Sequence, residues 1–302
     1  MNPCRFALSL ISLAVLLALT GCKEPGSPAV PTGSVKANAA YRTHFGEPPT
    51  PEQGTCFARV GYFPLAGEPD RLRAVPLFIF REKEQLAHLL AALPFRDLEF
   101  PPHSSLQNPF PPGSTIRVTA QAGESVTIDL VVPGVDQDSP GFRGILASVV
   151  ETALQFEEIN RVFITVAGVS LAEMPVGGFR HDPGRIAPAG SPLPLMVGGN
   201  WEMDTEGPEE IFINFDRPVS VQAIRLLDAA GREIRGEYFR TGFDMTVVLR
   251  PAVAAALREG ISVRVEWRIS DRLGRSGNGE QNFILKRLSH AEDKSLPESP
   301  AR

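Results

Sequence analysis

Five histidines and three cysteines are the side chains of this protein best suited to bind a metal ion or to act as nucleophiles. The histidines are His44, His88, His103, His181 and His290. No two of them stand at the spacing of a metal-ligand pair, so each is interpreted as a solvated or linker residue. No histidine or cationic partner for Cys56 is visible in the sequence, and we interpret this residue as a small buried apolar side chain.

The sequence contains no recognisable catalytic motif. It has no G-x-S-x-G elbow, no phosphate-binding P-loop and no G-x-G-x-x-G turn. Gly274, Gly277 and Gly279 are expected to lie in a hairpin turn. Residues 136–141, DQDSPG, resemble the opening of a calcium loop, but Pro140 and Ala147 stand where that loop needs ligands. We interpret the stretch as a loop that ends in a helix cap. No clustered acid–base pair is visible, so we expect a protein that is not an enzyme, with no catalytic residue, cofactor or metal site.

Cys22 is the residue to which the sequence assigns a chemical role. An uncharged apolar run from Phe6 to Thr20 precedes it and is shorter than the ~20 apolar residues that a membrane-spanning helix needs. The stretch LTGC at residues 19–22 resembles a bacterial lipobox. This resemblance implies removal of residues 1–21, a diacylglycerol on the Cys22 sulfur and acylation of the new N-terminus, which together hold a protein on a membrane. An uncleaved anchor and a plain secretion signal are the alternatives.

Composition limits the partners and the covalent links of the chain. The 302 residues include 30 Lys and Arg against 35 Asp and Glu, for a formal net charge of -5. No cluster of Lys and Arg is long enough to form a nucleic-acid-binding stripe, so nucleic acid is not expected as a partner. After removal of the leader only Cys22 and Cys56 remain, and with Cys22 lipidated no disulfide can form within the chain.

A segment without sustained apolar periodicity follows the lipobox. Residues 22–55 are rich in Pro, Gly, Ser and Ala, and we interpret them as a flexible tether. A coil of this length spans about 30 Å root-mean-square. Such a tether would place the folded part of the protein clear of the lipid headgroups.

The first folded unit is expected over residues 56–172, in the order strand, strand, helix, hairpin, helix, strand. Leucines recur at helical spacing in REKEQLAHLLAAL, and two runs of alternating residues meet at Ala122-Gly123 as a hairpin. Ser139 and Pro140 predict the N-cap and first residue of the second helix. We expect two helices on one face of one sheet and a solvated opposite face. Its polar hairpin residues are Arg117, Thr119, Thr127 and Asp129.

Several of these stretches resemble one protein family. GYFP, LAHLLAALPF, PPGSTIRVTAQAGESVTIDL and ILASVVETALQFEEINRVFITVAG are similar to the GerMN domain of bacterial sporulation and germination lipoproteins. That domain is also found in envelope lipoproteins of bacteria that form no spores. The resemblance rests on small and apolar positions and on the hairpin residue Gly123. It implies an extracytoplasmic interaction module, related in fold to ring-building motifs of secretion-type assemblies, and it carries over no active site.

A linker is expected over residues 173–199 and a second folded unit over residues 200–288. The second unit consists of short alternating runs separated by turn signals, which are typical of an immunoglobulin-like sandwich. In ISVRVEWRI, Trp267 falls on the inward side with the apolar residues and is interpreted as an anchor of the core. The polar residues 289–302 are expected to form a disordered tail.

Two stretches of this second unit, FDRPVSVQAIRLLDAAGREI and GISVRVEWRISDRLGRSGNGEQNF, resemble bacterial immunoglobulin-like modules. The second stretch is also similar to the end of a CopC-type copper-binding domain. That resemblance implies a histidine in the turn after the tryptophan strand, where this chain has Arg275, and the mature chain would begin with lipidated Cys22 in place of a free histidine. Copper needs imidazole or thioether ligands, so we expect the fold without the metal.

These features predict an α+β GerMN-like unit followed by an all-β immunoglobulin-like unit, in a lipoprotein anchored through Cys22 at the extracytoplasmic face of the cell membrane. The protein would act without catalysis as an interaction or assembly module that binds envelope proteins or the cell wall. Sporulation or germination is the expected process if the organism forms spores, and homo-oligomerisation is left open. The alternative is an exported carrier that binds a small molecule or a metal ion through the β-sandwich.

Overall fold

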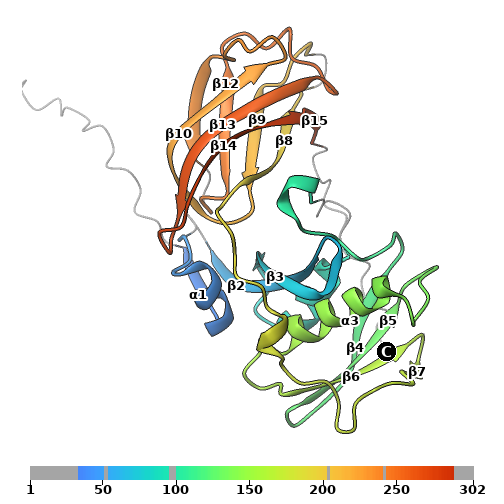
Figure 1. Cartoon of the computed structure of the whole chain (residues 1–302). Coiled ribbons are helices and arrows are strands. Elements are labelled where there is room, and N and C mark those ends of the chain that lie inside the picture. Colours follow the sequence, from blue (N-terminus) through green and yellow to red (C-terminus); the bar gives the residue numbers. More distant parts are fainter. Residues whose placement is uncertain (1–32, 51–53, 95–99, 203–204, 241–242, 289–302) are drawn as a thin grey trace, which may run out of the picture. The chain divides into compact units, whose positions relative to one another are not determined.

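The computed structural model describes residues 33–50, 54–94, 100–202, 205–240 and 243–288. The expected leader, Cys22 and the expected tail over residues 289–302 lie outside the described residues. The described residues form a mixed α+β fold in which strands predominate (Figure 1). None of their helices has the length and apolar character needed to cross a membrane.

The first sheet begins inside the segment expected to be a tether. It contains β1 (Ser34–Ala37), β2 (Thr55–Leu65) and β3 (Glu68–Ile79), with α1 (Ala39–Phe45) after β1. β1 pairs in parallel with β2, and β2 pairs antiparallel with β3. The Asn38 side chain caps α1 by accepting a hydrogen bond from the Tyr41 amide, and Tyr41 and Phe45 are buried against the sheet. The structure therefore differs from the expected tether from Ser34 onward.

A second sheet and two longer helices complete the α+β unit. They are α2 (Gln85–Ala92), α3 (Pro140–Ala153), β4 (Thr115–Ala122), β5 (Ser125–Val131), β6 (Arg161–Val166) and β7 (Val169–Ser170), with the short 3-10 helices η1 (Pro102–Ser104) and η2 (Pro183–Arg185). The sheet order is β4-β5-β6-β7, and α3 connects the parallel strands β5 and β6. The structure contains the predicted helices, the hairpin at Gly123 and the Ser139 cap.

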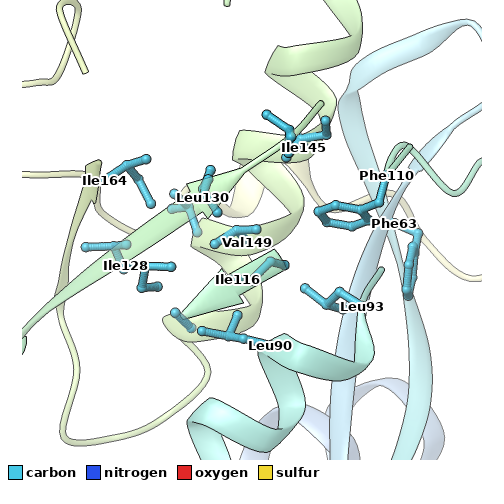
Figure 2. Packing of buried hydrophobic residues seen from close by; sticks show 14 of the residues in the cluster. Phe63, Leu90, Leu93, Phe110, Ile116, Ile128, Leu130, Ile145, Val149 and Ile164 are labelled. Atoms are coloured by element: carbon cyan, nitrogen blue, oxygen red, sulfur yellow. The ribbon is translucent and has the colours of Figure 1, made fainter. Parts of the chain in front are cut away.

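Helix α3 lies between the two sheets (Figure 1). It contacts β2 and β3, and it contributes to a hydrophobic cluster that also includes residues of α2, β4, β5 and β6. Figure 2 shows the centre of this cluster, with Phe63, Leu90, Leu93, Phe110, Ile116, Ile128, Leu130, Ile145, Val149 and Ile164. The prediction that both helices cover one face of a single sheet is therefore wrong, because α3 is buried against a sheet on either side.

A polar stripe on α3 completes the edge of β2, beyond the short stretch that pairs with β1. The Ser148 hydroxyl donates to the carbonyl of Tyr62, and the Tyr62 amide donates to Thr152 Oγ1 at 3.1 Å. Just after the helix, Gln155 Oε1 accepts from the Val60 amide at 2.9 Å, and Gln155 Nε2 donates to the Val60 carbonyl at 2.6 Å. Side chains of a helix thus satisfy backbone groups that a neighbouring strand would otherwise pair.

The remaining strands form two sheets around a second hydrophobic cluster. They are β8 (Pro194–Asn200), β9 (Glu210–Phe215), β10 (Val219–Asp228), β11 (Gly236–Arg240), β12 (Thr246–Pro251), β13 (Ser262–Asp271), β14 (Ser276–Ile284) and β15 (Lys286–Arg287). One sheet has the order β10-β13-β14 and the other β11-β12-β9-β8-β15. The described strands of this unit pair antiparallel except for β15, which runs parallel to β8.

Three features of this β unit differ from the sequence-based expectation. η2 and all but the last residue of β8 lie within residues 173–199, which were expected to be a linker. Gly277 and Gly279 belong to β14 and not to a turn; a Cβ at Gly279 would lie 3.0 Å from the Trp267 ring. Trp267 is only partly buried, whereas its strand neighbours Val263 and Val265 are fully buried.

Candidate functional site

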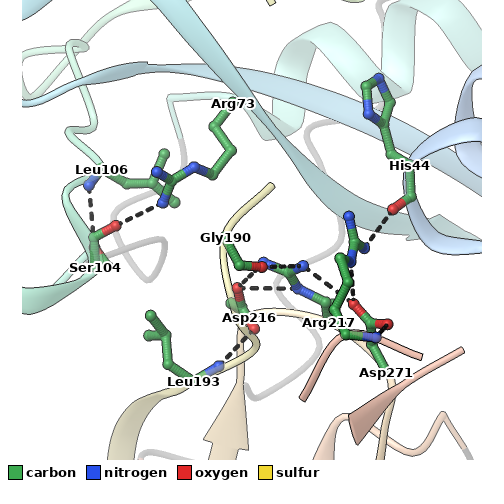
Figure 3. Close-up of polar contacts among 10 residues, drawn as sticks. His44, Arg73, Ser104, Leu106, Gly190, Leu193, Asp216, Arg217 and Asp271 are labelled. Carbon is green, nitrogen blue, oxygen red and sulfur yellow. Dashed lines mark hydrogen bonds and ion pairs between the residues drawn. The ribbon is translucent and has the colours of Figure 1, made fainter. Parts of the chain in front are cut away.

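Four charged side chains form a largely buried cluster at the ends of three strands (Figure 3). Asp216 and Arg217 follow β9, Asp271 is the last residue of β13, and Arg275 precedes β14. Arg217 is 2% exposed, and Asp216 and Asp271 are also buried. Charged side chains at such depth need partners, since an isolated buried charge is unfavourable by several kcal/mol.

The four side chains supply most of those partners to one another. Arg217 Nη2 lies 2.6 Å from Asp216 Oδ2, and Arg217 Nη1 lies 3.3 Å from Asp271 Oδ2. Arg275 Nε lies 2.5 Å from the same Asp271 oxygen. The other Asp271 oxygen accepts hydrogen bonds from the backbone amides of Leu273 and Arg275, both at 3.0 Å. Two guanidinium groups thus balance two carboxylates.

The cluster also binds backbone groups from distant parts of the chain. Arg217 Nη1 donates to the Gly190 carbonyl at 3.0 Å, and the Leu193 amide donates to Asp216 Oδ1 at 3.1 Å. Arg275 Nη2 donates to the carbonyl of His44, at the end of α1, at 2.7 Å. Residues of the expected linker and of the expected tether are therefore fixed to the ends of the β strands.

Burial dominates the electrostatics of this cluster. It raises the pKa of the Asp216 carboxyl, while the adjacent Arg217 guanidinium acts in the opposite direction. Arg73 on β3 lies close enough to interact with both; its pKa is lowered by burial and then by Arg217. Arg73 donates to the Ser104 carbonyl at 2.9 Å. Because its charges are paired and buried, the cluster is suited to hold segments together and offers no free group for proton transfer.

A second polar group surrounds Glu151, a buried residue of α3. Its Oε2 lies 2.6 Å from His181 Nδ1, and its Oε1 accepts from the Asp182 amide at 3.0 Å. Nearby, His44 Nε2 lies 3.2 Å from the Tyr62 hydroxyl. Burial and then Glu151 raise the pKa of Tyr62, and burial and then Arg275 lower the pKa of His44. These pairs position the two histidines, with a ring nitrogen of His181 facing a carboxylate and a ring nitrogen of His44 facing a phenol hydroxyl.

The other residues considered from sequence are dispersed. His103 Nε2 lies 3.0 Å from the Pro194 carbonyl, His88 lies on α2, and His290 falls outside the described residues. Cys56 is fully buried and free, and burial raises its pKa to about 11. Among the described residues no three His, Cys, Asp or Glu side chains could together hold a metal ion.

The clusters around Asp216 and Glu151 were missed from sequence for a physical reason. Charged residues at strand ends, as in FDRP and ISDR, are normally solvated, so their burial depends on which segments pack over them. A signal was present for Glu151, because it interrupts the long apolar stretch of α3. A carboxylate in that position must find a buried donor or disrupt the helix packing.

The four polar residues expected on the solvated face of the second sheet differ in exposure. Arg117 and Thr119 on β4 are exposed, but Asp129 on β5 is 7% exposed. One of its oxygens accepts from Thr165 Oγ1 and from the Gly168 amide, both at 2.7 Å, and the Thr165 bond contributes most to lowering its pKa. Asp129 therefore holds the turn between β6 and β7. The opposite edge of the sheet is β4, which pairs with β5 alone among the described strands.

Several solved structures show distant similarity to this chain, and no curated protein matches it. The first GerMN domain of the sporulation protein GerM from Bacillus subtilis is 21% identical, with 41% of this chain and 93% of that chain covered and a TM-score of 0.32. The tandem GerMN domains of the same protein are 16% identical, with 64% and 59% covered and a TM-score of 0.32. CopC from Methylosinus trichosporium OB3b is 15% identical, with 32% and 96% covered and a TM-score of 0.24. At these scores the structural similarities carry no argument about function.

A family model gives a firmer assignment for part of the chain. The model of the Germane family, described as sporulation and spore germination, matches residues 62–172. The matched range begins within β2, ends just after β7, and includes α2, α3 and the second sheet. Over residues 62–172 the chain therefore matches the Germane family, which confirms the GerMN-type domain predicted from the sequence.

Proposed function

We propose that this protein is an extracytoplasmic lipoprotein, anchored to the cell membrane through Cys22, that acts as a non-catalytic interaction module of the envelope in sporulation or germination. The observation that carries the proposal is the match of residues 62–172 to the Germane family. The lipobox-like LTGC sequence supports the anchor and the compartment. Envelope proteins or the cell wall are the proposed partners.

The polar groups of the described residues support a role without catalysis. The buried carboxylates of Asp216, Asp271 and Glu151 are each paired with a side chain and with backbone amides. The buried thiol of Cys56 has a raised pKa, which is unfavourable for a nucleophile. Binding through an exposed surface needs none of these groups.

The β4 edge is the surface of the α+β unit best suited to bind a partner strand. β4 is eight residues long and pairs on one side with β5, and no described strand pairs with its other side. An open edge presents unpaired amides and carbonyls to a partner in extended conformation. Arg117 and Thr119 are exposed on this strand and would contact side chains of that partner. Pairing with a second copy would produce a homo-oligomer in the same way.

We further infer that β8 to β15 form an immunoglobulin-like sandwich. Two sheets of mostly antiparallel strands enclose one cluster, in which Val263 and Ile269 of one sheet pack with Ile213 and Leu249 of the other. This arrangement supports a second interaction module next to the GerMN-type domain. The Arg275 side chain is bound to Asp271 and to the His44 carbonyl, so it occupies the turn to which the CopC resemblance assigns a histidine.

The experiment combines a deletion strain with cross-linking of the membrane-bound protein. We expect deletion to impair sporulation, germination or wall integrity, and expect the wild-type protein to be cross-linked to an envelope partner. Arg117→Glu, which reverses the charge beside the β4 edge, should weaken this cross-link and the complementation of the deletion. Arg258→Glu is the matched control, because Arg258 is exposed on the connection between β12 and β13. An unaltered deletion phenotype without any cross-linked partner would contradict the proposal.

A further inference from the structure

An aromatic pair lies at the end of the first sheet from which the chain before β1 leads toward Cys22: Phe80 is exposed, and Phe243, between β11 and β12, is partly buried. The pairing of Phe57 with Lys36 on one side and Ile79 on the other places the start of β1 and the end of β3 at the same end of this sheet. Phe80 is the residue that follows β3. An ion pair of 3.6 Å between Lys36 and Glu82 also places the loop after β3 beside β1.

Phe80 is a large apolar side chain in a position where water reaches it. Phe80 is 65% exposed. The centroid of its ring lies 5.8 Å from the centroid of the Phe243 ring, in an edge-to-face arrangement. Phe243 in turn lies 4.5 Å from Phe78, which is partly buried. Phe78 thus packs both against Phe243 and against the hydrophobic cluster under α1, and this packing fixes the position of the aromatic pair.

Charge around this aromatic pair is balanced. Arg81 and Lys83 are exposed in the loop after β3, and so are Glu82 and Glu84. The loop therefore has no net charge that would select an anionic or a cationic surface. The exposed Phe80 ring is therefore the feature of this position best suited to contact an apolar partner.

The length of chain before β1 limits the distance between this end of the sheet and the anchor. Residues 23–33 separate Cys22 from Ser34, and a chain of that length spans at most about 40 Å when fully extended. The tether expected from sequence was three times longer, because the expectation included α1 and β1. Covalent attachment at Cys22 would therefore keep the aromatic pair at a high effective concentration next to the bilayer.

We propose that Phe80 and Phe243 contact the bilayer in which Cys22 is anchored, with their rings in the headgroup region. This inference rests on the proposed lipid anchor. Aromatic and aliphatic side chains bind the membrane interface through the apolar area that they bury there. The contact would fix the orientation of the GerMN-type domain relative to the membrane. The balanced charge of the loop makes this contact independent of anionic lipid.

The test attaches the unlipidated chain, starting at Cys22, to vesicles through its Cys22 thiol and a maleimide lipid. Cys56 is fully buried, so coupling is selective for Cys22. The phosphatidylcholine vesicles contain a lipid with a photoactivatable diazirine near the glycerol, and labelled peptides are identified by mass spectrometry. We expect at least fivefold more label in the peptide with Phe80 than in the peptide with Val253, which is 74% exposed on the β unit.

Matched variants distinguish insertion from general proximity. Phe80→Ser should reduce the label to the level at Val253, whereas Val253→Ser should leave the label at Phe80 unchanged. Replacing a third of the lipid by phosphatidylglycerol should change the Phe80 label less than twofold. Equal label in both peptides, or label in neither, would overturn the proposal and leave the aromatic pair for a protein partner.

The labelling experiment tests the bilayer contact separately from the lipid modification of Cys22. Chemical coupling through Cys22 tests the orientation of the fold whether or not the cell attaches a lipid there. Mass spectrometry of the protein extracted from cell membranes tests the lipid on Cys22 itself. An unmodified Cys22 would refute the anchor, whereas absent labelling at Phe80 after coupling would refute only the bilayer contact.

Discussion

Replacing Arg217 by methionine removes the guanidinium that bridges Asp216 and Asp271 and preserves most of the apolar length of the side chain. Asp271 keeps Arg275 at 2.5 Å as a partner. Asp216 keeps the Leu193 amide as a partner but loses its ion pair. Because Asp216 is only 8% exposed, water cannot fully replace that pair. The loss should therefore fall mainly on Asp216, as a buried carboxylate that has lost its ion pair and keeps only the electrostatic effect of Arg73.

Breaking a buried ion pair by removal of one partner costs about 3–5 kcal/mol. Because Asp271 retains Arg275, we expect the lower end, about 3 kcal/mol, for Arg217→Met at neutral pH. Burial already raises the pKa of Asp216, and removal of Arg217 removes the main opposing effect. In the variant the folded state would bind a proton at Asp216 more readily than the unfolded chain, whose Asp pKa is about 3.9. The difference in the free energy of unfolding between the wild type and Arg217→Met should thus become smaller as the pH falls toward 4.

Urea unfolding followed by tryptophan fluorescence measures this effect, because both tryptophans, Trp201 and Trp267, lie in the β unit. Arg225→Met is the matched control, since Arg225 pairs with Glu266 at the surface with 59% of its side chain exposed. It should cost at most about 1 kcal/mol. A loss below about 1 kcal/mol for Arg217→Met, or an equal loss at pH 4.5 and pH 7.5, would refute the reasoning.

Three further predictions concern the α+β unit. The Cys56 thiol, with a pKa of about 11 and no exposure, should react with a thiol reagent only after unfolding; stoichiometric reaction of the native protein would contradict its burial. The pKa of His44 is lowered by burial and then by Arg275, so stability should be complete above about pH 6.5 and decline below it. In His44→Gln the free energy of unfolding in urea should no longer include this decline below pH 6.5. If its pH dependence equals that of the wild type, His44 does not cause the decline. Thr152→Val leaves the Tyr62 amide without its acceptor and should lower the free energy of unfolding by about 1–3 kcal/mol, as measured by denaturation followed by circular dichroism. An unchanged free energy of unfolding would show that the bond contributes little.

Local patterns were sufficient to predict most elements of the α+β unit. Leu86, Leu89 and Leu90 are buried on α2, as their helical spacing predicts. The hairpin turns at Gly123 with a positive φ of 56°, and Ser139 accepts the Phe142 amide as an N-cap. Each of these features depends on residues that are close in the sequence, so the chemistry of a short stretch decides it.

The arrangement of the sheets and the buried polar clusters could not be predicted in this way. The apolar stripe of α3 shows that the helix is buried but does not show that a second sheet lies behind it. Ser148 and Thr152 within that stretch are the signal for the second contact, since their hydroxyls must find buried partners. The seven residues of α1 were too few to show a helical period. Asp216 finds its amide partner at Leu193, and Arg217 finds its carbonyl partner at Gly190, so both partners depend on the tertiary fold.

Gln155, just after α3, forms hydrogen bonds with two segments that precede α3 in the chain. Besides the Val60 backbone, its Oε1 accepts a hydrogen bond from Asn38, the residue that caps α1. The cluster under α1 also includes Ala147 of α3. The contacts that hold β1 and α1 are therefore complete only when α3 has packed beside β2. β1 and α1, although they precede α3 in the chain, would therefore reach their final order only after α3 has packed.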